Sequence, residues 1–349
     1  MVDTIESKLI TIGDINIEEM DNLKQHISEL KSPLGYRYCD ILEESRNKDR
    51  GLIIKISYPR YFYGSNAYLV TTKYECFEVQ KHFIDSIMED TFFSQIVAGI
   101  QLTRVDIPFT YYMNKVLDFH SYVNVYRIFA EVYNNIKENA RAKGYVDLLD
   151  GKYETVIYSD NGKTDKSSNN RLMIYNQYQN LKCKLGDDDI TEIEIKYPDI
   201  KRRMRLEVAK RIRRKEFSLE KFKNLDILGE YFEEYRSYIL ENVLNEKEIE
   251  AFYNKKVEEL VNKLIKERAY GKFKYEVFIL KNFQSVYDYE ILRRALKINI
   301  DNKKTRENAI TRVRKILTDY EYENKIIVMD TYKIICEMRE YIKNLKVED

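Results

Sequence analysis

The chain of 349 residues is poor in several residue types: it has no tryptophan, 11 glycines, 4 prolines, 4 cysteines and 3 histidines. So few glycines and prolines exclude a collagen-like or low-complexity chain, and a hydrophobic content of 44% excludes a globally disordered one. No apolar run approaches the roughly 18–20 residues of a membrane span, and Met1–Ser7 lacks the basic-then-apolar pattern of a signal peptide. We therefore expect a soluble, cytoplasmic protein with no membrane partner.

The scarce cysteines and histidines exclude several kinds of site. The cysteines lie far apart without a C-x-x-C pair, which is typical of unpaired structural thiols in a reducing cytosol. The histidines have no spacing that builds a local zinc site or a two-histidine metal motif. These residues are Cys39, Cys76, Cys183, Cys336, His26, His82 and His120. Any chemistry must therefore use carboxylates and hydroxyls.

The N-terminal two-thirds of the chain has a mixed pattern. Alternation with period two predicts strands, and apolar residues at helical spacing predict helices over 74–88 and 124–143. The polar segment Ser159–Asn170 is rich in turn formers and predicts a hairpin loop or a flap. The predicted strands are Leu52–Tyr58, Tyr68–Thr72, Gln101–Phe109, Tyr153–Tyr158, Arg171–Tyr175 and Met204–Ile212.

After about residue 216 the pattern becomes helical throughout, with only two further glycines and no proline. The predicted helices are Leu225–Leu244, Glu248–Arg268, Tyr287–Leu296, Lys304–Tyr320 and Ile326–Leu345. We therefore expect an α+β fold in two domains. Residues 1–216 would form a mixed or antiparallel sheet with packed helices, and residues 217–349 an all-helical accessory domain.

The formal net charge of +1 hides strong local imbalance. Lys201–Lys215, which we call the basic stripe, holds nine basic residues and one acid, a local charge of +8. Asp187–Asp199 upstream holds six acids and one lysine, and Ser218–Ala251 downstream holds nine acids and four basic residues. A basic stripe is the usual footprint of nucleic-acid contact, although a solvated charged face has the same pattern. Arginine outnumbers lysine in the stripe, which favours phosphate binding.

Three predicted strands each place charged or phenolic side chains on one face, because side chains two residues apart point the same way. The pairs are Arg104 with Asp106, Arg171 with Tyr175, and Arg205 with Glu207. If the strands are neighbours, one sheet face presents Asp106, Glu207 and Tyr175 among three arginines. An Arg-x-acid pair alone is often only a surface ion pair that contributes about 0–1 kcal/mol, so this simpler interpretation stays open.

The chemistry available to such a face is phosphoryl transfer. Two carboxylates without an imidazole suit a hard divalent cation, Mg²⁺ or Mn²⁺. Such an ion polarises a phosphodiester and neutralises charge that develops during in-line displacement. A tyrosine hydroxyl, with a free pKa near ~10, becomes a nucleophile when the ion and the arginines stabilise its phenolate. Its attack on phosphorus gives a covalent phosphotyrosine.

Five segments of the chain together resemble a known family. They are MVDTI at 1–5, IKISYPRYFYGSNAYL at 54–69, LTRVDI at 102–107, YETVIY with RLMIYNQY between 153 and 178, and RLEVAK at 205–210. In this order and spacing the chain resembles the replication initiation proteins of the filamentous-phage gene II/X family, which are similar to the rolling-circle initiators of some Gram-positive plasmids. The resemblance covers about residues 1–215.

The resemblance implies a metal-dependent nickase that cuts one strand at a double-stranded origin through a tyrosine, leaves a 3′-hydroxyl and later rejoins the strand. Tyr175 in I-Y-N-Q-Y matches the family's tyrosine, Asp106 the acid of its R-x-D motif and Glu207 the acid of R-x-E. The two acids would hold the metal. Gln177 stands where a lysine is common, and Tyr178 offers a second hydroxyl, so Tyr175 and Tyr178 are both candidate nucleophiles.

The expected partner is origin DNA, both duplex and single-stranded. The helical domain would add origin recognition, homodimerisation or capture of a host helicase. The expected phosphate and DNA contacts are Arg104, Arg171, Arg205, Lys201, Arg202, Arg203, Lys210, Arg211, Arg213 and Arg214. Two alternatives stay open: a conjugative relaxase with the same chemistry at a transfer origin, and a non-catalytic, sequence-specific DNA-binding protein.

Overall fold

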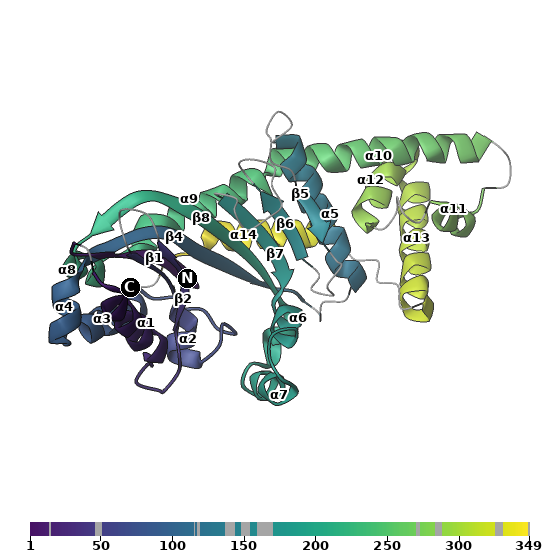
Figure 1. The fold of residues 1–349 in the computed structure, drawn as a ribbon. Coiled ribbons are helices and arrows are strands. Elements are labelled where there is room, and N and C mark those ends of the chain that lie inside the picture. The colour runs from purple at the N-terminus through teal and green to yellow at the C-terminus, as the bar shows by residue number, and fades with distance from the viewer. Residues whose placement is uncertain are drawn as a thin grey trace.

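An antiparallel sheet lies at the centre of the fold (Figure 1). The computed structural model describes residues 1–13, 15–45, 51–114, 116, 119–136, 144–147, 154–158, 170–269, 273–282, 288–324 and 331–347. Within these residues eight strands pair in the order β2-β3-β1-β4-β8-β7-β6-β5. The strands are β1 Thr4–Thr11, β2 Cys39–Ser45, β3 Gly51–Ser57, β4 Val97–Tyr112, β5 Gly144–Asp147, β6 Glu154–Tyr158, β7 Asn170–Asn176 and β8 Arg203–Phe217.

The two faces of the central strands differ because apolar and polar residues alternate along them. Ile107 of β4 is paired with Val208 of β8, and both side chains lie in the hydrophobic core. The next residue pair, Asp106 with Ala209, points to the opposite face. β7 continues the antiparallel pairing on the other side of β8. Polar residues of β4, β8 and β7 are thereby aligned across one face.

Helices pack around the sheet in the first two-thirds of the chain. α1 and α3 each begin with a capping box, Asn16 with Glu19 and Thr72 with Glu75. Figure 1 places α1–α4 together below one end of the sheet and α5 against the strands of the other end. The helices are α1 Ile17–Glu29, α2 Tyr58–Tyr63, α3 Lys73–Met88, α4 Thr91–Ile96, α5 Phe119–Ile136, α6 Gln177–Lys182, α7 Asp187–Lys196 and the 3-10 helix η1 Pro198–Arg202.

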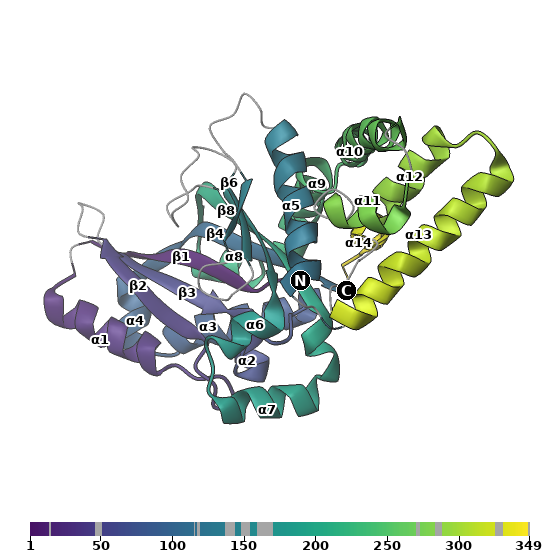
Figure 2. The same ribbon diagram turned by 90° about the vertical axis from the view of Figure 1, so that its right-hand side faces the viewer.

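The chain after β8 is helical. α9 and α14 pack against the sheet, whereas α10–α13 extend away from it (Figures 1 and 2). The Tyr235 hydroxyl of α9 donates to the Val105 carbonyl of β4 at 3.2 Å, so this helix shares the core of the sheet. No helix among the described segments is long and apolar enough to cross a membrane. The helices are α8 Leu219–Lys223, α9 Ile227–Asn242, α10 Glu246–Ala269, α11 Tyr275–Lys281, α12 Tyr289–Asn299, α13 Lys303–Asn324 and α14 Thr331–Asn344.

The predicted α+β fold class is confirmed, and the strand-to-helix change falls at residue 217, where β8 ends. The predicted strand Tyr68–Thr72 is wrong, because Val70 makes only an isolated bridge with Val2 and Thr72 caps α3. The sequence pattern does not predict β1, since the buried Ser7 interrupts its apolar face. Most of the predicted loop, at 159–169, lies outside the described residues, and β6 and β7 on either side of it pair antiparallel.

A network of charges joins α10, α12 and α14. Arg294 of α12 donates to Glu250 of α10 and to Glu290 of its own helix, each at 2.7 Å. Its guanidinium also lies 4.5 Å from the ring centroid of Tyr332 on α14. The hydrogen bond from Arg294 holds the pKa of the Glu250 carboxyl below its usual range. Arg294 therefore ties three helices together.

Replacing Arg294 with methionine is expected to lower the free energy of unfolding by about 1–3 kcal/mol, because hydrogen bonds to charged groups contribute about that much. The folded-state pKa of Glu250 is lowered, so the stabilisation is present above the ordinary glutamate range and is lost as pH falls through the lowered pKa. Urea unfolding at pH 7 and at pH 3 measures both effects. Arg312→Met, which breaks an exposed pair with Glu276, is the control and is expected to leave the free energy of unfolding nearly unchanged. Equal losses in both variants would contradict the role of Arg294.

Candidate functional site

Three neighbouring strands bring the predicted catalytic side chains to one face of the sheet. Tyr175 of β7 pairs with Arg205 of β8, and Glu207 of β8 pairs with Met173 of β7 and with Pro108 of β4. Asp106 lies two residues before Pro108 and therefore on the same face. All four polar side chains are buried. The name polar cluster is used for these four residues together with the buried Asp3, which lies near Arg205.

Tyr175 lies at the centre of the polar cluster. Its hydroxyl donates a hydrogen bond of 2.7 Å to Glu207 Oε2, and Arg205 Nη1 lies 3.5 Å from the Tyr175 hydroxyl oxygen. Only 3% of Tyr175 is exposed. Burial, followed by the negative charge of Glu207, raises the pKa of Tyr175 well above its usual value. In this arrangement the phenol is neutral and its proton points at a carboxylate.

Arg205 supplies the positive charge beside this hydroxyl and is completely buried. Its Nη2 donates to the Asn66 carbonyl at 2.9 Å, and its Nη1 lies 3.8 Å from Asp3 Oδ2. Asp3 is also buried, and burial raises its pKa although Arg205 opposes the shift. The sequence gives no prediction for Asp3, because a single acid at the start of a chain carries no signal of where the fold will place it.

Asp106 is held by an arginine of its own strand. Arg104 donates to both carboxylate oxygens, at 2.7 and 2.8 Å, and to Glu6 of β1 at 2.9 Å. Burial raises the pKa of Asp106 to about 7, with a further contribution from the nearby Glu207 and an opposing one from Arg104. The negative charge of Glu207 therefore acts on Asp106, whose two carboxylate oxygens both accept from Arg104.

The carboxylates of the polar cluster have the chemistry of a site for a hard cation. Mg²⁺ is commonly bound through one or two carboxylates, with water and substrate phosphate completing its shell. Asp106 and Glu207 are ligands of this type, and in the structure they bind Arg104 and the Tyr175 hydroxyl. Among the described residues no group of three or more His, Cys, Asp or Glu side chains is arranged to hold a metal.

Tyr178, the second candidate nucleophile, lies outside the polar cluster. It is the second residue of α6, and its hydroxyl donates to Glu194 of α7. Lys201 also binds Glu194, at 2.7 Å. The hydrogen bond to Glu194 raises the pKa of Tyr178 to about 12. Gln177 between the two tyrosines is buried and donates to the Asn66 carbonyl at 2.8 Å. The geometry thus separates the two hydroxyls: that of Tyr175 lies beside Glu207, and that of Tyr178 beside Glu194.

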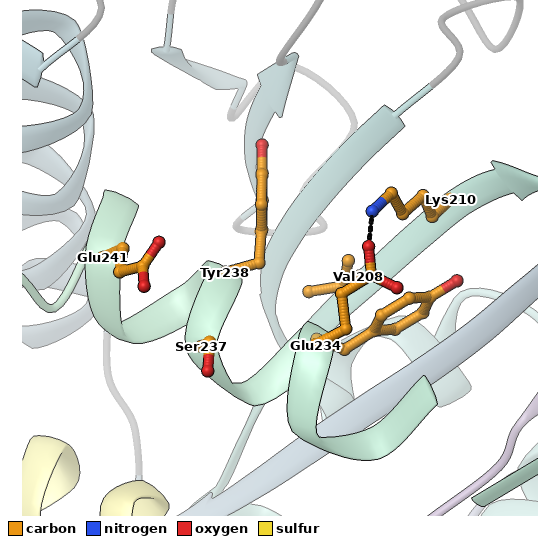
Figure 3. Close-up of a pocket in the computed structure, with 7 residues that line it drawn as sticks. Val208, Lys210, Glu234, Ser237, Tyr238 and Glu241 are labelled. Atoms are coloured by element: carbon orange, nitrogen blue, oxygen red, sulfur yellow. Dashed lines mark hydrogen bonds and ion pairs between the residues drawn. The ribbon is translucent and has the colours of Figure 1, made fainter. Parts of the chain in front are cut away.

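Most of the described side chains of the basic stripe are buried or paired with acids. The acidic segments on either side of the stripe supply many of the partners. Figure 3 shows Lys210 of β8 reaching Glu234 of α9. Lys215 binds Glu230 at 2.9 Å, and Arg202 binds Asp199. Much of the charge of the described lysines and arginines is therefore paired with acids within the fold.

The remaining predicted DNA contacts differ in accessibility. Arg203 and Arg205 are buried, and Arg211 is exposed with no ion pair among the described residues. The side chains of Arg171, Arg213 and Arg214 lie outside the described part of the structure, although their backbones belong to β7 and β8. The pocket of about 270 Å³ in Figure 3 is lined by Val208 and by α9, on the face of β8 opposite to Glu207. It is therefore separate from the polar cluster.

Comparison with known proteins finds no relative: no protein-family model, no curated protein and no solved structure matches the chain. The resemblance to the gene II/X family therefore stays a prediction.

Proposed function

We propose that this chain is a DNA nickase and strand transferase that initiates replication at an origin, with Tyr175 as its nucleophile. The observation that carries the proposal is the 2.7 Å hydrogen bond from the Tyr175 hydroxyl to Glu207. A nucleophile within hydrogen-bond reach of a carboxylate has its general base in place. Arg205 lies beside the Tyr175 hydroxyl oxygen and can stabilise the phenolate and the phosphate.

The proposed reaction exchanges one phosphoester bond for another. The Tyr175 oxygen attacks phosphorus while its proton passes to Glu207. A bond forms between this oxygen and phosphorus, the bond to the 3′-oxygen breaks, and that oxygen takes a proton from water. The products are a free 3′-hydroxyl and a 5′-phosphotyrosine. Attack by a 3′-hydroxyl on the phosphotyrosine reverses the steps and rejoins the strand, so no cofactor is consumed.

Substrate must open the site before Tyr175 can react, because its hydroxyl is covered. Arg205 and Gln177 both donate to the Asn66 carbonyl, at 2.9 and 2.8 Å, and hold the chain around Asn66 against the strands. A DNA phosphate is a stronger acceptor for Arg205 than a neutral carbonyl. Binding of phosphate would therefore replace the Asn66 carbonyl and open a path towards Tyr175.

Asp106 and Glu207 would hold Mg²⁺ or Mn²⁺ in this proposal. When bound, the ion supplies Lewis-acid polarisation of the scissile phosphate. Arg104 positions Asp106 through its two hydrogen bonds of 2.7 and 2.8 Å. Glu207 would act both as the acceptor of the Tyr175 proton and as a ligand, as its two carboxylate oxygens allow.

The burial of Tyr175 and the raised pKa of its hydroxyl favour a second candidate function. In that case the polar cluster is structural, and the chain is a DNA-binding protein without catalytic activity. The two functions differ in one observable product, the covalent protein–DNA adduct.

The proposal is tested with a random-sequence pool of single-stranded oligonucleotides that carry a fluorescent label at the 3′ end. After incubation with the full chain and Mg²⁺ or Mn²⁺, a denaturing gel separates protein from free DNA. We expect a fluorescent band that migrates with the protein and is absent when EDTA is present during the incubation. DNA binding under native conditions without such a band in either cation would favour the non-catalytic function instead.

A further inference from the structure

A pocket of about 130 Å³ lies beside the polar cluster, large enough for several water molecules. Among its walls are Thr110 and Tyr112 of β4, Arg203 and Arg205 of β8, Tyr68 of the segment before α3, and Tyr341 of α14. Arg205 belongs to both places, since its Nη1 lies 3.5 Å from the Tyr175 hydroxyl. A ligand in this pocket would therefore be separated from the nucleophile by one guanidinium group.

Arg203 is a buried cation whose charge no acid in the described part of the chain balances. It is 4% exposed and forms no ion pair with a carboxylate among the described residues. Its Nη1 donates to the Ala67 carbonyl, and its Nε has no hydrogen-bond partner. The guanidinium lies 4.7, 5.3 and 5.8 Å from the ring centroids of Tyr68, Tyr112 and Tyr197. By contrast, Arg205 beside it lies near Asp3.

A buried guanidinium without an anion is unfavourable, and contacts with aromatic rings compensate for only part of its desolvation. The missing partner is an anion, which the adjoining pocket has room to accept. Two of the rings around Arg203 also remain accessible, because Tyr68 is 40% and Tyr112 is 38% exposed. Arginine together with accessible aromatic rings is the combination that binds the phosphate and the base of an unpaired nucleotide.

We propose that this pocket and the exposed rings beside it bind one nucleotide of single-stranded DNA next to the scissile phosphate. Arg203 takes the phosphate, and the exposed rings of Tyr68 and Tyr112 take the base. The adjacency to a scissile phosphate rests on the proposed nickase function, whereas the binding of the nucleotide does not. Because bases inside a duplex are already stacked, the pocket selects single strands.

Fluorescence anisotropy with fluorescein-labelled dT10 and the full chain tests the pocket. Arg203→Gln is expected to weaken binding about tenfold or more, as the loss of a charge-assisted contact does. Tyr112→Leu is expected to weaken it about fivefold or more through lost stacking. Arg312→Gln, which removes an equal charge at an exposed position of α13, is the control, with an expected change under about twofold. Thermal unfolding followed by circular dichroism checks that each variant is folded.

Unchanged dT10 binding by folded Arg203→Gln and Tyr112→Leu would overturn the inference, even if the wild-type chain forms a covalent adduct. If Arg203→Gln does not fold, Tyr112→Leu alone decides, because its ring is partly exposed and Arg203 is kept. Loss of binding in both variants without any wild-type adduct would support the pocket and contradict the nickase function. The two proposals therefore fail separately.

Discussion

Replacing Tyr175 with phenylalanine is expected to abolish the covalent DNA adduct and to slow nicking by roughly three orders of magnitude or more. Without the nucleophile only binding and charge stabilisation remain, and these cannot form the phosphotyrosine. The substitution keeps the buried ring and removes the hydroxyl that donates to Glu207 at 2.7 Å. The lost hydrogen bond is expected to cost about 1–3 kcal/mol of stability. Nicking is measured on the DNA sequence recovered from wild-type adducts.

Tyr178→Phe provides the matched comparison, three residues along the chain. Its hydroxyl binds Glu194 of α7 and has no contact with the polar cluster. We therefore expect this variant to form the adduct at a rate within about threefold of wild type, since a substitution away from the reacting atoms has small effects. The opposite result, with adduct lost in Tyr178→Phe and kept in Tyr175→Phe, would transfer the nucleophile role to Tyr178.

Replacing Arg205 with leucine is expected to lower the free energy of unfolding by about 3–5 kcal/mol. The side chain is fully buried, and its charge lies beside the buried acids Asp3 and Glu207. Removing it leaves these acids without their cation and leaves the Asn66 carbonyl without the donor at 2.9 Å. Urea unfolding at neutral pH measures the loss.

Arg211→Leu, six residues further along β8, is the control for this destabilisation. Arg211 is exposed and has no ion pair among the described residues, so we expect a change within about 0.5 kcal/mol. The loss in Arg205→Leu is expected to shrink at acid pH, because protonation removes the unpaired negative charges. Burial already raises the pKa of Asp3, so this recovery begins above the ordinary aspartate range. A loss under about 1 kcal/mol for Arg205→Leu would contradict the proposed role of its charge.

The composition of the polar face follows from local sequence. Period-two alternation puts Arg205 and Glu207 on the same side of one strand and Arg104 and Asp106 on the same side of another, whatever the rest of the fold does. Alternation does not show which strands are neighbours. The structure shows that β7 and β4 both pair with β8, and in which register. Tyr175 meets Glu207 for this reason, although the two are 32 residues apart in sequence.

Contacts that use the backbone could not be predicted in this way. The Asn66 carbonyl accepts from Arg205 across 139 residues, and a carbonyl has no signature in the sequence. The burial of Arg203 could not be predicted either, because its ring partners Tyr68 and Tyr197 come from separate segments of the chain. Tertiary placement, and not residue type, decides which cations are accessible.

The basic stripe illustrates the limit of charge counting. The sequence places a local charge of +8 between two acidic segments, which is typical of nucleic-acid contact. In the fold the acids of α7 and α9 lie against the stripe and bind Lys201, Lys210 and Lys215. A sum over consecutive residues does not include such partners. The stripe therefore contributes less exposed charge than its composition predicts. The proposed contact with DNA is correspondingly limited to the polar cluster and the pocket beside it.

The measurement that tests the central claim most directly is the identification of the residue that carries DNA. The wild-type adduct is digested with nuclease and trypsin, and the modified peptide is sequenced by mass spectrometry. Cleavage after Arg171 and Lys182 releases residues 172–182, which contain both Tyr175 and Tyr178. We expect fragmentation to place the nucleotide phosphate on Tyr175. A phosphate on Tyr178, a phosphate on a tyrosine outside this peptide, or DNA binding without any adduct would contradict the proposed function of Tyr175.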